Sequence, residues 1–337
     1  MTPTLPAALL TARTAVDPEL RKVIGKLDPD TRGVCEYHFG WTNADGSPNG
    51  GGGKAVRPAL VLLSAQAVAP NGAQAVPAAA AVELVHNFSL LHDDLLDGDT
   101  SRRHRPTAWT VFGRPAALLA GDALLGLSTE VLLDSTSGDA IASARALCAA
   151  VRSLIAGQNA DLDFEHRRDV TLDECLHMAH EKTAALLACS TSIGALHVGA
   201  ARETVERLHA FGSELGMAFQ LVDDLLGLWG DPEVTGKPVL SDLRARKKTV
   251  PIVHALTSGT EAGQRLGELY GKEEPLTEAE LHEAADMVSR AGSQQWTQDE
   301  CERRLASAHR HLPKSAGNPE AVESLTELAE FIVRRQR

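Results

Sequence analysis

The tetrapeptide Asp-Asp-Leu-Leu occurs twice in the chain, at residues 93–96 and again at 223–226. Each copy stands inside an otherwise apolar segment, NFSLLHDDLLD in the first case and GMAFQLVDDLLG in the second. In a helix, residues four positions apart share a face, so Asp93 and Asp97 project together with Asp94 beside them. Carboxylates this close repel one another and are costly to desolvate, and a hard cation removes that cost. Mg²⁺ is usually held by one or two carboxylates together with substrate phosphates, so the pattern predicts two facing helices that clamp a diphosphate through metal ions.

Basic residues stand beside both acidic segments. They are Lys54 and Arg57 after the glycine run at 50–53, Arg102 and Arg103 after the first pair, Lys182 with Thr183 at the start of an apolar segment, and Lys237, Lys247 and Lys248 after the second pair. Arginine suits bidentate contacts to a diphosphate, and lysine suits a point-charge contact. A single lysine or arginine is also common on an ordinary solvent-exposed helix surface, so none of these residues is informative alone. Their placement beside both acid pairs favours diphosphate binding.

Seven segments of the chain resemble the trans-isoprenyl diphosphate synthases, also called polyprenyl synthases. They are GGKAVRP (52–58), LLHDDLLDGDTSRRHRPT (90–107), LAGDALL (119–125), GQNADLDFE (157–165), EKTAALL (181–187), FQLVDDLLG (219–227) and GKPVLSDLRARKKTVP (236–251). The resemblance implies an all-α protein with one domain over residues 1–337, a helical bundle of the class I isoprenoid synthase type around a central cavity. Its motif core is at about 50–260 and a helical C-terminal part at 276–337. It also implies a homodimer.

The same resemblance implies the activity and the residues that carry it. The reaction is a Mg²⁺-dependent head-to-tail condensation of isopentenyl diphosphate with an allylic diphosphate, with three Mg²⁺ in each active site. Asp93 and Asp97 would hold Mg²⁺ with Asp94 in support, and Asp223 with Asp224 would form the second metal-binding pair. The residues expected to bind isopentenyl diphosphate are Lys54, Arg57, His86 and Arg103. Those expected at the allylic diphosphate are Arg102, Lys182, Thr183, Gln220, Lys237 and Lys247, with Lys182 counted among the catalytic residues.

The chain departs from the family pattern at two positions. The second acidic motif normally ends in an acid at its fifth position, where this chain has Gly227. Asp231 is an alternative carboxylate four residues further on, and we expect Gly227→Asp to be tolerated. The glycine that usually follows the paired arginines is His104. This second change would alter the loop that closes over the site.

Product length is predicted from the residues just before the first acid pair. In the family, the fourth and fifth residues before the first aspartate help to set the floor of the cavity that receives the growing chain. Here they are Ser89 and Phe88. The small Ser89 leaves room for the chain and Phe88 blocks it further on, a combination typical of geranylgeranyl (C20) synthases.

Two other functions fit parts of the pattern. A class I terpene cyclase on the same fold would ionise a prenyl diphosphate without a second substrate, and it would not need Lys54, Arg57 and Arg103. A regulatory subunit of a prenyl synthase would be expected to lose acids of the first cluster, whereas this chain keeps all three. A Ca²⁺-binding structural protein would need a D-x-D-x-D-G loop, which the sequence lacks.

Helices are the elements that must position these side chains. Segments rich in Ala, Leu and Glu, with β-branched residues scattered too thinly for strands, predict helices. These segments cover residues 55–69, 76–97, 115–133, 139–163, 171–199, 202–228 and 248–257, with a more polar set of helices at 276–337. Glycine- and proline-rich breaks separate them.

Composition narrows the classes of partner and compartment. The 337 residues include 33 Lys+Arg against 45 Asp+Glu, a formal charge of −12, which argues against a nucleic-acid binder but permits a locally basic pocket. Five cysteines, at 35, 148, 175, 189 and 301, are far apart and never in C-x-x-C spacing, which indicates a reducing cytoplasm. The N-terminus lacks the order of a signal peptide. No run of about 18 uncharged apolar residues occurs, so we expect no transmembrane segment and a cytoplasmic protein.

Overall fold

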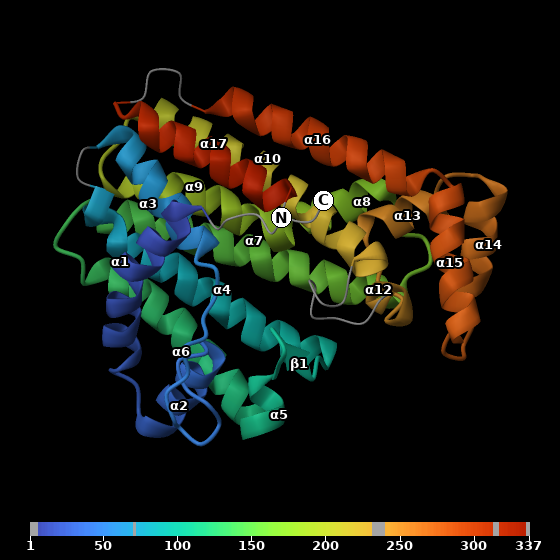
Figure 1. Ribbon diagram of the computed structural model, residues 1–337, viewed down its shortest axis with the longest axis horizontal. Coiled ribbons are helices and arrows are strands. Elements are labelled where there is room, and N and C mark those ends of the chain that lie inside the picture. Colours follow the sequence, from blue (N-terminus) through green and yellow to red (C-terminus); the bar gives the residue numbers. More distant parts are fainter. Residues whose placement is uncertain (1–5, 70–71, 231–239, 313–316, 335–337) are drawn as a thin grey trace. The chain divides into compact units, whose positions relative to one another are not determined.

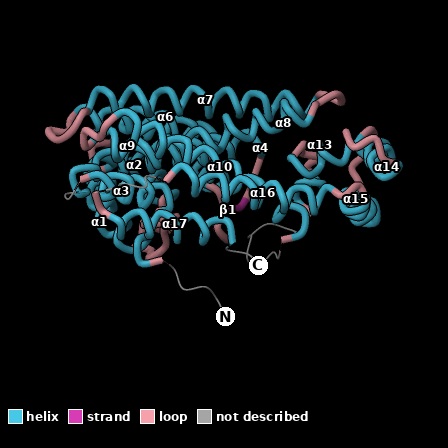
Figure 2. Tube along the Cα trace, turned by 90° about the horizontal axis from the view of Figure 1, so that it is seen from above, coloured by secondary structure: helices cyan, strands magenta, loops and turns pink. Residues whose placement is uncertain are grey.

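The computed structural model describes residues 6–69, 72–230, 240–312 and 317–334. Helix fills most of this part of the chain, as Figure 1 and Figure 2 show. The all-α prediction is therefore confirmed. The two strands that the described residues contain, β1 (Ser101–Arg102) and β2 (Arg105–Pro106), form one antiparallel hairpin.

The helices reproduce the segments expected from the sequence to within a few residues. They are α3 (Val56–Val68), α4 (Val76–Asp97), α6 (Arg114–Leu133), α7 (Ala140–His166), α8 (Leu172–Ala179), α9 (Ala185–His197), α10 (Arg202–Trp229) and α13 (Val250–Leu256). The polar C-terminal helices are α15 (Glu278–Arg290), α16 (Ser293–His311) and α17 (Pro319–Arg334). The sequence analysis did not predict α1 (Ala7–Ile24), α2 (Pro29–His38), η1 (Gly72–Ala75), α5 (Ala108–Phe112), α12 (Ser241–Arg244) and α14 (Glu261–Tyr270).

The chain divides into two compact units, and each unit is assembled from separate stretches of sequence. The first comprises residues 1–151, 189–210 and 311–331. The second comprises residues 152–188, 211–310 and 332–337. The first unit contains the first acid cluster and the second unit contains the second, so each cluster has its own structural support.

In the first unit, α4 packs along α6, and α1 and α3 contact α4 and each other. The alanine run at 78–81 on α4 is completely buried, which lets neighbouring helices approach closely. Pro77 lies in the first turn of α4, where its missing N–H costs no hydrogen bond. Gly98 ends the helix in a left-handed conformation (φ +69°) that glycine adopts without strain.

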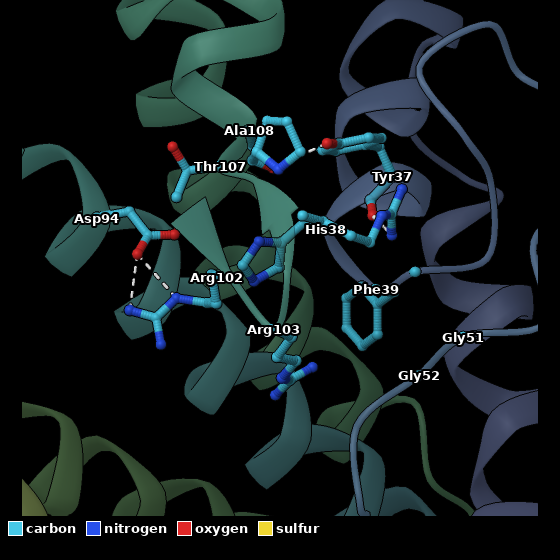
Figure 3. Close-up of a pocket in the computed structure, with 13 residues that line it drawn as sticks. Tyr37, His38, Phe39, Gly51, Gly52, Asp94, Arg102, Arg103, Thr107 and Ala108 are labelled. Atoms are coloured by element: carbon cyan, nitrogen blue, oxygen red, sulfur yellow. Dashed lines mark hydrogen bonds and ion pairs between the residues drawn. The ribbon is translucent and has the colours of Figure 1, made fainter. Parts of the chain in front are cut away.

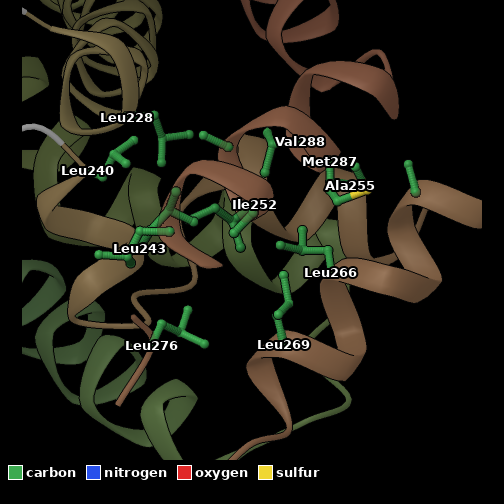
Figure 4. Close-up of a cluster of buried hydrophobic side chains, with 14 residues drawn as sticks. Leu228, Leu240, Leu243, Ile252, Ala255, Leu266, Leu269, Leu276, Met287 and Val288 are labelled. Carbon is green, nitrogen blue, oxygen red and sulfur yellow. The ribbon is translucent and has the colours of Figure 1, made fainter. Parts of the chain in front are cut away.

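In the second unit, a cluster of buried aliphatic side chains joins α10, α12, α13, α14 and α15 (Figure 4). Leu243, Ile252, Leu266 and Leu281 are fully buried within it. Each fully buried leucine or isoleucine contributes roughly 1.5–3 kcal/mol through burial alone. This core fixes the short helix α12 against the last turn of α10, because Leu228 belongs to the same cluster.

Two helices, α6 and α7, are long and apolar enough to cross a membrane by length and composition alone. Within the protein, 44% and 39% of their apolar windows are buried. Core helices of water-soluble proteins share this composition, so the absence of a membrane-spanning segment stays a prediction.

Candidate active site

The first acid cluster occupies the last turn and a half of α4. Carboxylates at a helix C-terminus are disfavoured by the negative end of the helix dipole, so this placement needs positive partners. The carboxylate of Asp94, only 2% exposed, receives a hydrogen bond from Nε of Arg102 at 2.8 Å, and Nη2 of Arg102 lies 2.7 Å from the same oxygen. Asp93 and Asp97 are partly exposed at one helical turn's spacing. Asp94 is therefore paired with Arg102, whereas Asp93 and Asp97 stay partly exposed.

Arg102 and Arg103 come from the β1–β2 hairpin, whose two-residue turn is Arg103-His104. Both turn residues have positive φ, +52° and +60°, as a tight hairpin turn requires. Glycine would adopt this conformation without strain, and His104 adopts it instead. The departure from the family pattern at position 104 thus leaves the tight turn in place.

Arg57 and His86 are brought together by α3 and α4, with Nη1 of Arg57 3.2 Å from Nε2 of His86. An arginine can only donate, so Nε2 of His86 accepts and the ring is neutral. Burial, with Arg57 and Arg103 nearby, lowers the pKa of His86 well below its usual value. The carboxyl group of Glu83, 8% exposed and one turn earlier, has its pKa raised by burial and lowered in part by the same two arginines.

The glycine run leads into Lys54 and is held by arginine side chains. Nη2 of Arg13 donates to the carbonyl oxygen of Gly51 at 3.1 Å. A Cβ atom on Gly52 would lie 2.6 Å from the Arg13 guanidinium, and one on Gly53 would lie 3.3 Å from that of Arg103. Only glycine fits at position 52 without displacing Arg13. Lys54 is exposed at the end of this loop.

A pocket of about 190 Å³ opens between this loop, α2 and the hairpin (Figure 3). Gly52, Asp94, Arg102, Arg103 and His38 line it. Burial, followed by the charges of Arg103, Arg102 and Arg105, lowers the pKa of His38 to about 3, so the ring is neutral near pH 7. The pocket wall is thus basic although the chain is acidic.

Phe88 and Ser89, the residues expected to set product length, are both buried on α4. The Phe88 ring packs edge-on against His92, with centroids 4.8 Å apart. Nε2 of His92 lies 3.1 Å from the carbonyl oxygen of Leu118 and so donates to it. A Cβ on Gly121 would lie 2.3 Å from the same nitrogen, so the glycine of the LAGDALL motif makes room for His92. Phe88 is therefore held by a fixed partner.

In the second unit, Lys182 and Thr183 lie on a single turn of π-helix, η2 (His180–Ala184), between α8 and α9. Such turns are frequent at functional sites. Two glycines let the neighbouring helices reach it: a Cβ on Gly157 would lie 2.2 Å from the Lys182 nitrogen, and one on Gly216 would lie 2.5 Å from Cα of Ala184. The wide turn is thereby held between α7 and α10.

Two side chains of this turn make polar contacts: Lys182 forms an ion pair, and Thr183 begins a chain of hydrogen bonds. Nζ of Lys182 donates to Oδ2 of Asp161 at 2.6 Å. Oγ1 of Thr183 donates to Oε1 of Gln220 at 2.6 Å, and Nε2 of Gln220 donates to Oδ1 of Asp224 at 2.6 Å. These contacts bring together four of the residues that the sequence singled out, and they add Asp161.

Asp224 belongs to the interior of the second unit. Its other carboxyl oxygen accepts a hydrogen bond from the backbone N–H of Val250 at 2.9 Å, and the side chain is buried. Burial raises the pKa of Asp224 to about 8, and the nearby carboxylates of Asp242 and Asp223 push it in the same direction. Asp223, the preceding residue, is only partly buried. Asp223 is therefore the exposed acid of this pair, and Asp224 anchors α10 to α13.

The expectation that Gly227→Asp is tolerated stays a prediction, which now depends on whether the Asp242 side chain can move. A Cβ atom on Gly227 would lie 2.0 Å from Oδ2 of Asp242, so the Asp242 side chain would have to shift to make room for a side chain there. Asp242 stands in the motif segment 236–251 together with Lys237, but the sequence analysis did not connect it with Gly227, Lys237 or Asp231. Asp231 and Lys237 lie outside the described part of the chain.

The donors suit Mg²⁺, although they do not form a closed cage. Within the described residues, no three His, Cys, Asp or Glu side chains converge as a ready-made metal site. Mg²⁺ takes oxygen ligands at near-octahedral geometry and completes its shell with waters and substrate phosphates. Partly exposed aspartates on helix ends, with basic residues near them, are that kind of incomplete site.

Comparisons with known proteins identify the family of the chain. Residues 47–288 match the family model described as polyprenyl synthetase. The chain is 48% identical over 99% of its length to a (2E,6E)-farnesyl diphosphate synthase of Mycobacterium tuberculosis, covering 94% of that protein. It is 42% identical over 98% of its length to a geranylgeranyl diphosphate synthase of the same organism, again covering 94%.

A solved structure gives the same result for the fold. The crystal structure of a polyprenyl synthetase from Streptomyces coelicolor A3(2) superposes with a TM-score of 0.92 at 47% identity, covering 98% of this chain and all of that one. The fold is therefore the all-α isoprenoid synthase fold, and the enzyme class is that of the prenyltransferases. The chain belongs to the polyprenyl synthetase family.

Some residues of this site were not singled out from the sequence. Asp161 pairs with Lys182, Glu83 supports the Arg57 and Arg103 region, and His38 lines the basic pocket. Asp161 stands inside the GQNADLDFE segment, so its motif was visible but its role was not. His38 lies outside every recognised motif, and only the folded chain brings it to the pocket.

Proposed function

We propose that the chain condenses isopentenyl diphosphate head to tail with an allylic diphosphate in a Mg²⁺-dependent reaction. Family membership supports a prenyl transfer of this kind. The observation that carries the proposal is the Arg57–His86 contact beside Arg103 and the glycine loop. A synthase needs such a second basic site for isopentenyl diphosphate, and a cyclase does not.

In the first unit, Lys54, Arg57, His86 and Arg103 bind isopentenyl diphosphate. The flexible, exposed Lys54 supplies a point charge, and the two arginines supply paired donors that match phosphate oxygens. Neutral His86 orients Arg57 by accepting its hydrogen bond. The carboxyl group of Glu83 lies buried behind the arginines, whose charges act against the rise in its pKa that burial causes.

The carboxylates Asp93, Asp97 and Asp223 hold the metal ions that accompany the allylic diphosphate, which we take to be three. Mg²⁺ held by these carboxylates would supply positive charge against the departing pyrophosphate, which favours ionisation of the allylic carbon–oxygen bond. Lys182, Thr183, Gln220, Lys247 and Lys237 contact the same diphosphate. Asp161 orients Lys182 through a 2.6 Å ion pair.

After ionisation, the double bond of isopentenyl diphosphate attacks the allylic cation, and a proton is lost. The chain's part in this step is to exclude water, which would quench the cation. Buried apolar side chains on α4, among them Phe88 and Leu91, form such a surface just before the acid cluster. The released pyrophosphate accepts the proton.

The proposed product is geranylgeranyl diphosphate (C20). Ser89 leaves space near the acids, and Phe88, backed by His92, closes the path one residue earlier on the helix. The second candidate is a farnesyl (C15) product, because the relative that is 48% identical carries that name. The two differ only in how far the chain grows before it meets a wall.

The experiment that tests the function is mass analysis of products from the purified chain. Isopentenyl diphosphate and Mg²⁺ are supplied with dimethylallyl, geranyl or farnesyl diphosphate in turn. C20 product from each starter supports the proposal, and growth that stops at C15 supports the second candidate. A hydrocarbon formed from the allylic substrate alone would indicate a cyclase. No turnover by the purified chain would indicate a regulatory subunit.

The proposal also includes a homodimer in the cytoplasm. Leu118, Leu119 and Leu133 of α6 and Ile141 of α7 are 47–63% exposed, more than isolated surface residues explain. A second copy of the chain would cover them. The molar mass of Leu119→Glu, measured by light scattering, tests this and should fall to that of one chain.

The five cysteines, all among the described residues, form no disulfide, which supports a reducing compartment.

A further inference from the structure

The short helix α12 ends in a turn whose left-handed residue is an arginine. The N–H of Lys247 donates to the carbonyl oxygen of Asp242 at 2.9 Å, and the N–H of Arg246 donates to that of Leu243 at 3.0 Å. This pair of hydrogen bonds is a Schellman motif, in which the residue after the C-cap adopts a left-handed conformation. That residue is Arg246, with φ +50°. Glycine takes this conformation without strain, whereas a residue with a Cβ atom adopts it only at a cost in free energy.

The side chain of Arg246 is tied to a second part of the same unit. Its guanidinium donates to the carbonyl oxygens of Lys272 and Glu274, through Nη1 and Nη2 respectively. Both carbonyls belong to the loop between α14 and α15. Leu269 and Leu276, which flank these two residues in the sequence, are buried in the aliphatic cluster of the second unit (Figure 4). The arginine thus bonds to a loop that the core holds in place, and this bonding offsets the cost of its backbone conformation.

The backbone of the next residue, Lys247, is also held by Tyr270, the last residue of α14. The Tyr270 hydroxyl donates to the carbonyl oxygen of Lys247 at 3.3 Å, and its ring packs against the same aliphatic cluster. Burial raises the pKa of Tyr270, as does the charge of Asp242, whereas Arg246 acts against the rise. The hydroxyl therefore keeps its proton near pH 7 and can donate it to the hydrogen bond. Both backbone groups of Lys247 are bonded, so its Cα atom is fixed relative to α12 and α14.

We propose that Arg246 and Tyr270 are positioning residues for Lys247, which they hold where its ammonium group meets the allylic diphosphate. This inference rests on the proposed function, since Lys247 is a diphosphate ligand there. Arg246 stabilises the left-handed turn, and Tyr270 fixes the carbonyl group of Lys247. A lysine has a long, flexible side chain, so a fixed backbone reduces the freedom that it loses when it binds an anion. Both residues act through Lys247 rather than by touching substrate.

Steady-state kinetics of the full chain with geranyl diphosphate and isopentenyl diphosphate tests the inference, because only the allylic substrate is expected at Lys247. Tyr270→Phe removes one neutral hydrogen bond and keeps the ring, and it should raise KM for geranyl diphosphate by about 2- to 10-fold. Arg246→Ala removes the guanidinium and keeps a Cβ atom, and it should raise that KM by about 10-fold or more. KM for isopentenyl diphosphate should stay within about twofold of wild type in both variants. Arg265→Ala, at an exposed arginine of α14, is the matched control and should leave both KM values unchanged.

Two further variants show whether the effect runs through the turn and through Lys247. Arg246→Gly removes the side-chain bonds and the backbone strain together, so it should bring KM for geranyl diphosphate back to within about threefold of wild type. Lys247→Ala should raise the same KM by itself. Adding Arg246→Ala to Lys247→Ala should raise KM no further, because the two residues act as one unit. A general structural role of Arg246 would instead add its own effect to that of Lys247→Ala.

A wild-type KM for geranyl diphosphate in either Tyr270→Phe or Arg246→Ala overturns this inference and leaves the proposed function standing. An equal rise in KM for both substrates does the same, and so does an additive effect in the double variant. Failure of Arg246→Gly to recover overturns it as well, provided that this variant melts at a temperature near that of wild type. A wild-type chain that consumes geranyl diphosphate without isopentenyl diphosphate, or not at all, overturns the proposed function, and this inference with it.

Discussion

Two nitrogens of the Arg102 guanidinium contact the same carboxylate oxygen of Asp94, Nε at 2.8 Å and Nη2 at 2.7 Å. The aspartate side chain is 2% exposed and the arginine 26% exposed, so the positive partner alone keeps contact with water. A charge buried in this way depends on its partner far more than a surface charge does. The pair also ties the β1–β2 hairpin to the end of α4.

Replacing Arg102 should therefore destabilise the protein. Arg102→Met leaves the Asp94 carboxylate buried without this guanidinium, a change that costs about 3–5 kcal/mol in fully buried pairs. We expect the lower end of that range in the free energy of unfolding, measured by urea denaturation, because Arg102 is partly solvated. Arg103→Met, one residue further in the exposed turn, is the control. Equal losses in the two variants would show that the ion pair contributes little.

The partly exposed acids should govern catalysis more than stability. Asp93→Ala or Asp97→Ala should each lower turnover by about 100-fold or more. Each variant removes a carboxylate that is proposed to hold Mg²⁺ beside the departing pyrophosphate. Excess chelator should abolish activity and Mg²⁺ should restore it, in a steady-state assay of the purified chain. Asp122→Ala, an exposed aspartate on α6, provides the comparison. Full activity in excess chelator would contradict the metal-dependent mechanism.

Product length should respond to the Phe88–His92 contact. Phe88→Ala removes the ring that closes the path and should shift products beyond C20, whereas Ser89→Phe should shorten them toward C15. Chromatography of dephosphorylated products measures the shift. Phe112→Ala removes a phenyl ring that packs on Tyr37 instead and should leave the distribution unchanged. An unchanged distribution in Phe88→Ala would place the floor of the cavity elsewhere.

The neutral histidines of the first unit predict a loss of stability in acid. Burial, with Arg103, Arg102 and Arg105 nearby, lowers the pKa of His38 to about 3 in the folded chain, against 6.5 ordinarily. Below pH 6.5 the unfolded chain binds a proton that the folded chain does not, so the free energy of unfolding falls as pH drops toward 3. The slope is up to about 1.4 kcal/mol per pH unit for each such group.

His38→Gln removes this group without adding charge, and its unfolding free energy should fall less steeply than that of wild type between pH 6.5 and pH 5. Urea denaturation at several pH values measures both slopes. His282→Gln, at an exposed histidine, should match wild type. Identical slopes in all three proteins would mean that His38 titrates normally.

Helical periodicity predicted most of the fold because each long helix carries its own signals. The range 76–97 was predicted to the residue, since Pro77 marks its first turn and Gly98 follows its last. The helix at 7–24 was missed because it contains Pro18 and few strong signals at its ends. Short elements such as α5 and α12 owe their form to packing, so local sequence predicts them poorly.

The residues of the candidate site likewise fall into those that the sequence predicted and those that only the folded structure reveals. Residues inside motifs, such as Asp93, Lys182 and Gln220, were found because motif spacing reports helix faces. His38 was not found, because it reaches the pocket only through the packing of α2 against the rest of the first unit.

The interleaving of the two units has a consequence for synthesis on the ribosome. The first unit needs residues 311–331 as well as residues 1–151, so 159 residues (152–310) must be translated between the end of its first segment and the beginning of its last. At about 5–20 residues per second, that interval is roughly 8–32 s. During it, the N-terminal helices lack α17, whose Leu325 and Leu328 are fully buried in the finished protein. The nascent chain therefore passes through a long stage with uncovered apolar surface, the stage at which chaperones act and at which a premature stop before α17 would be most damaging.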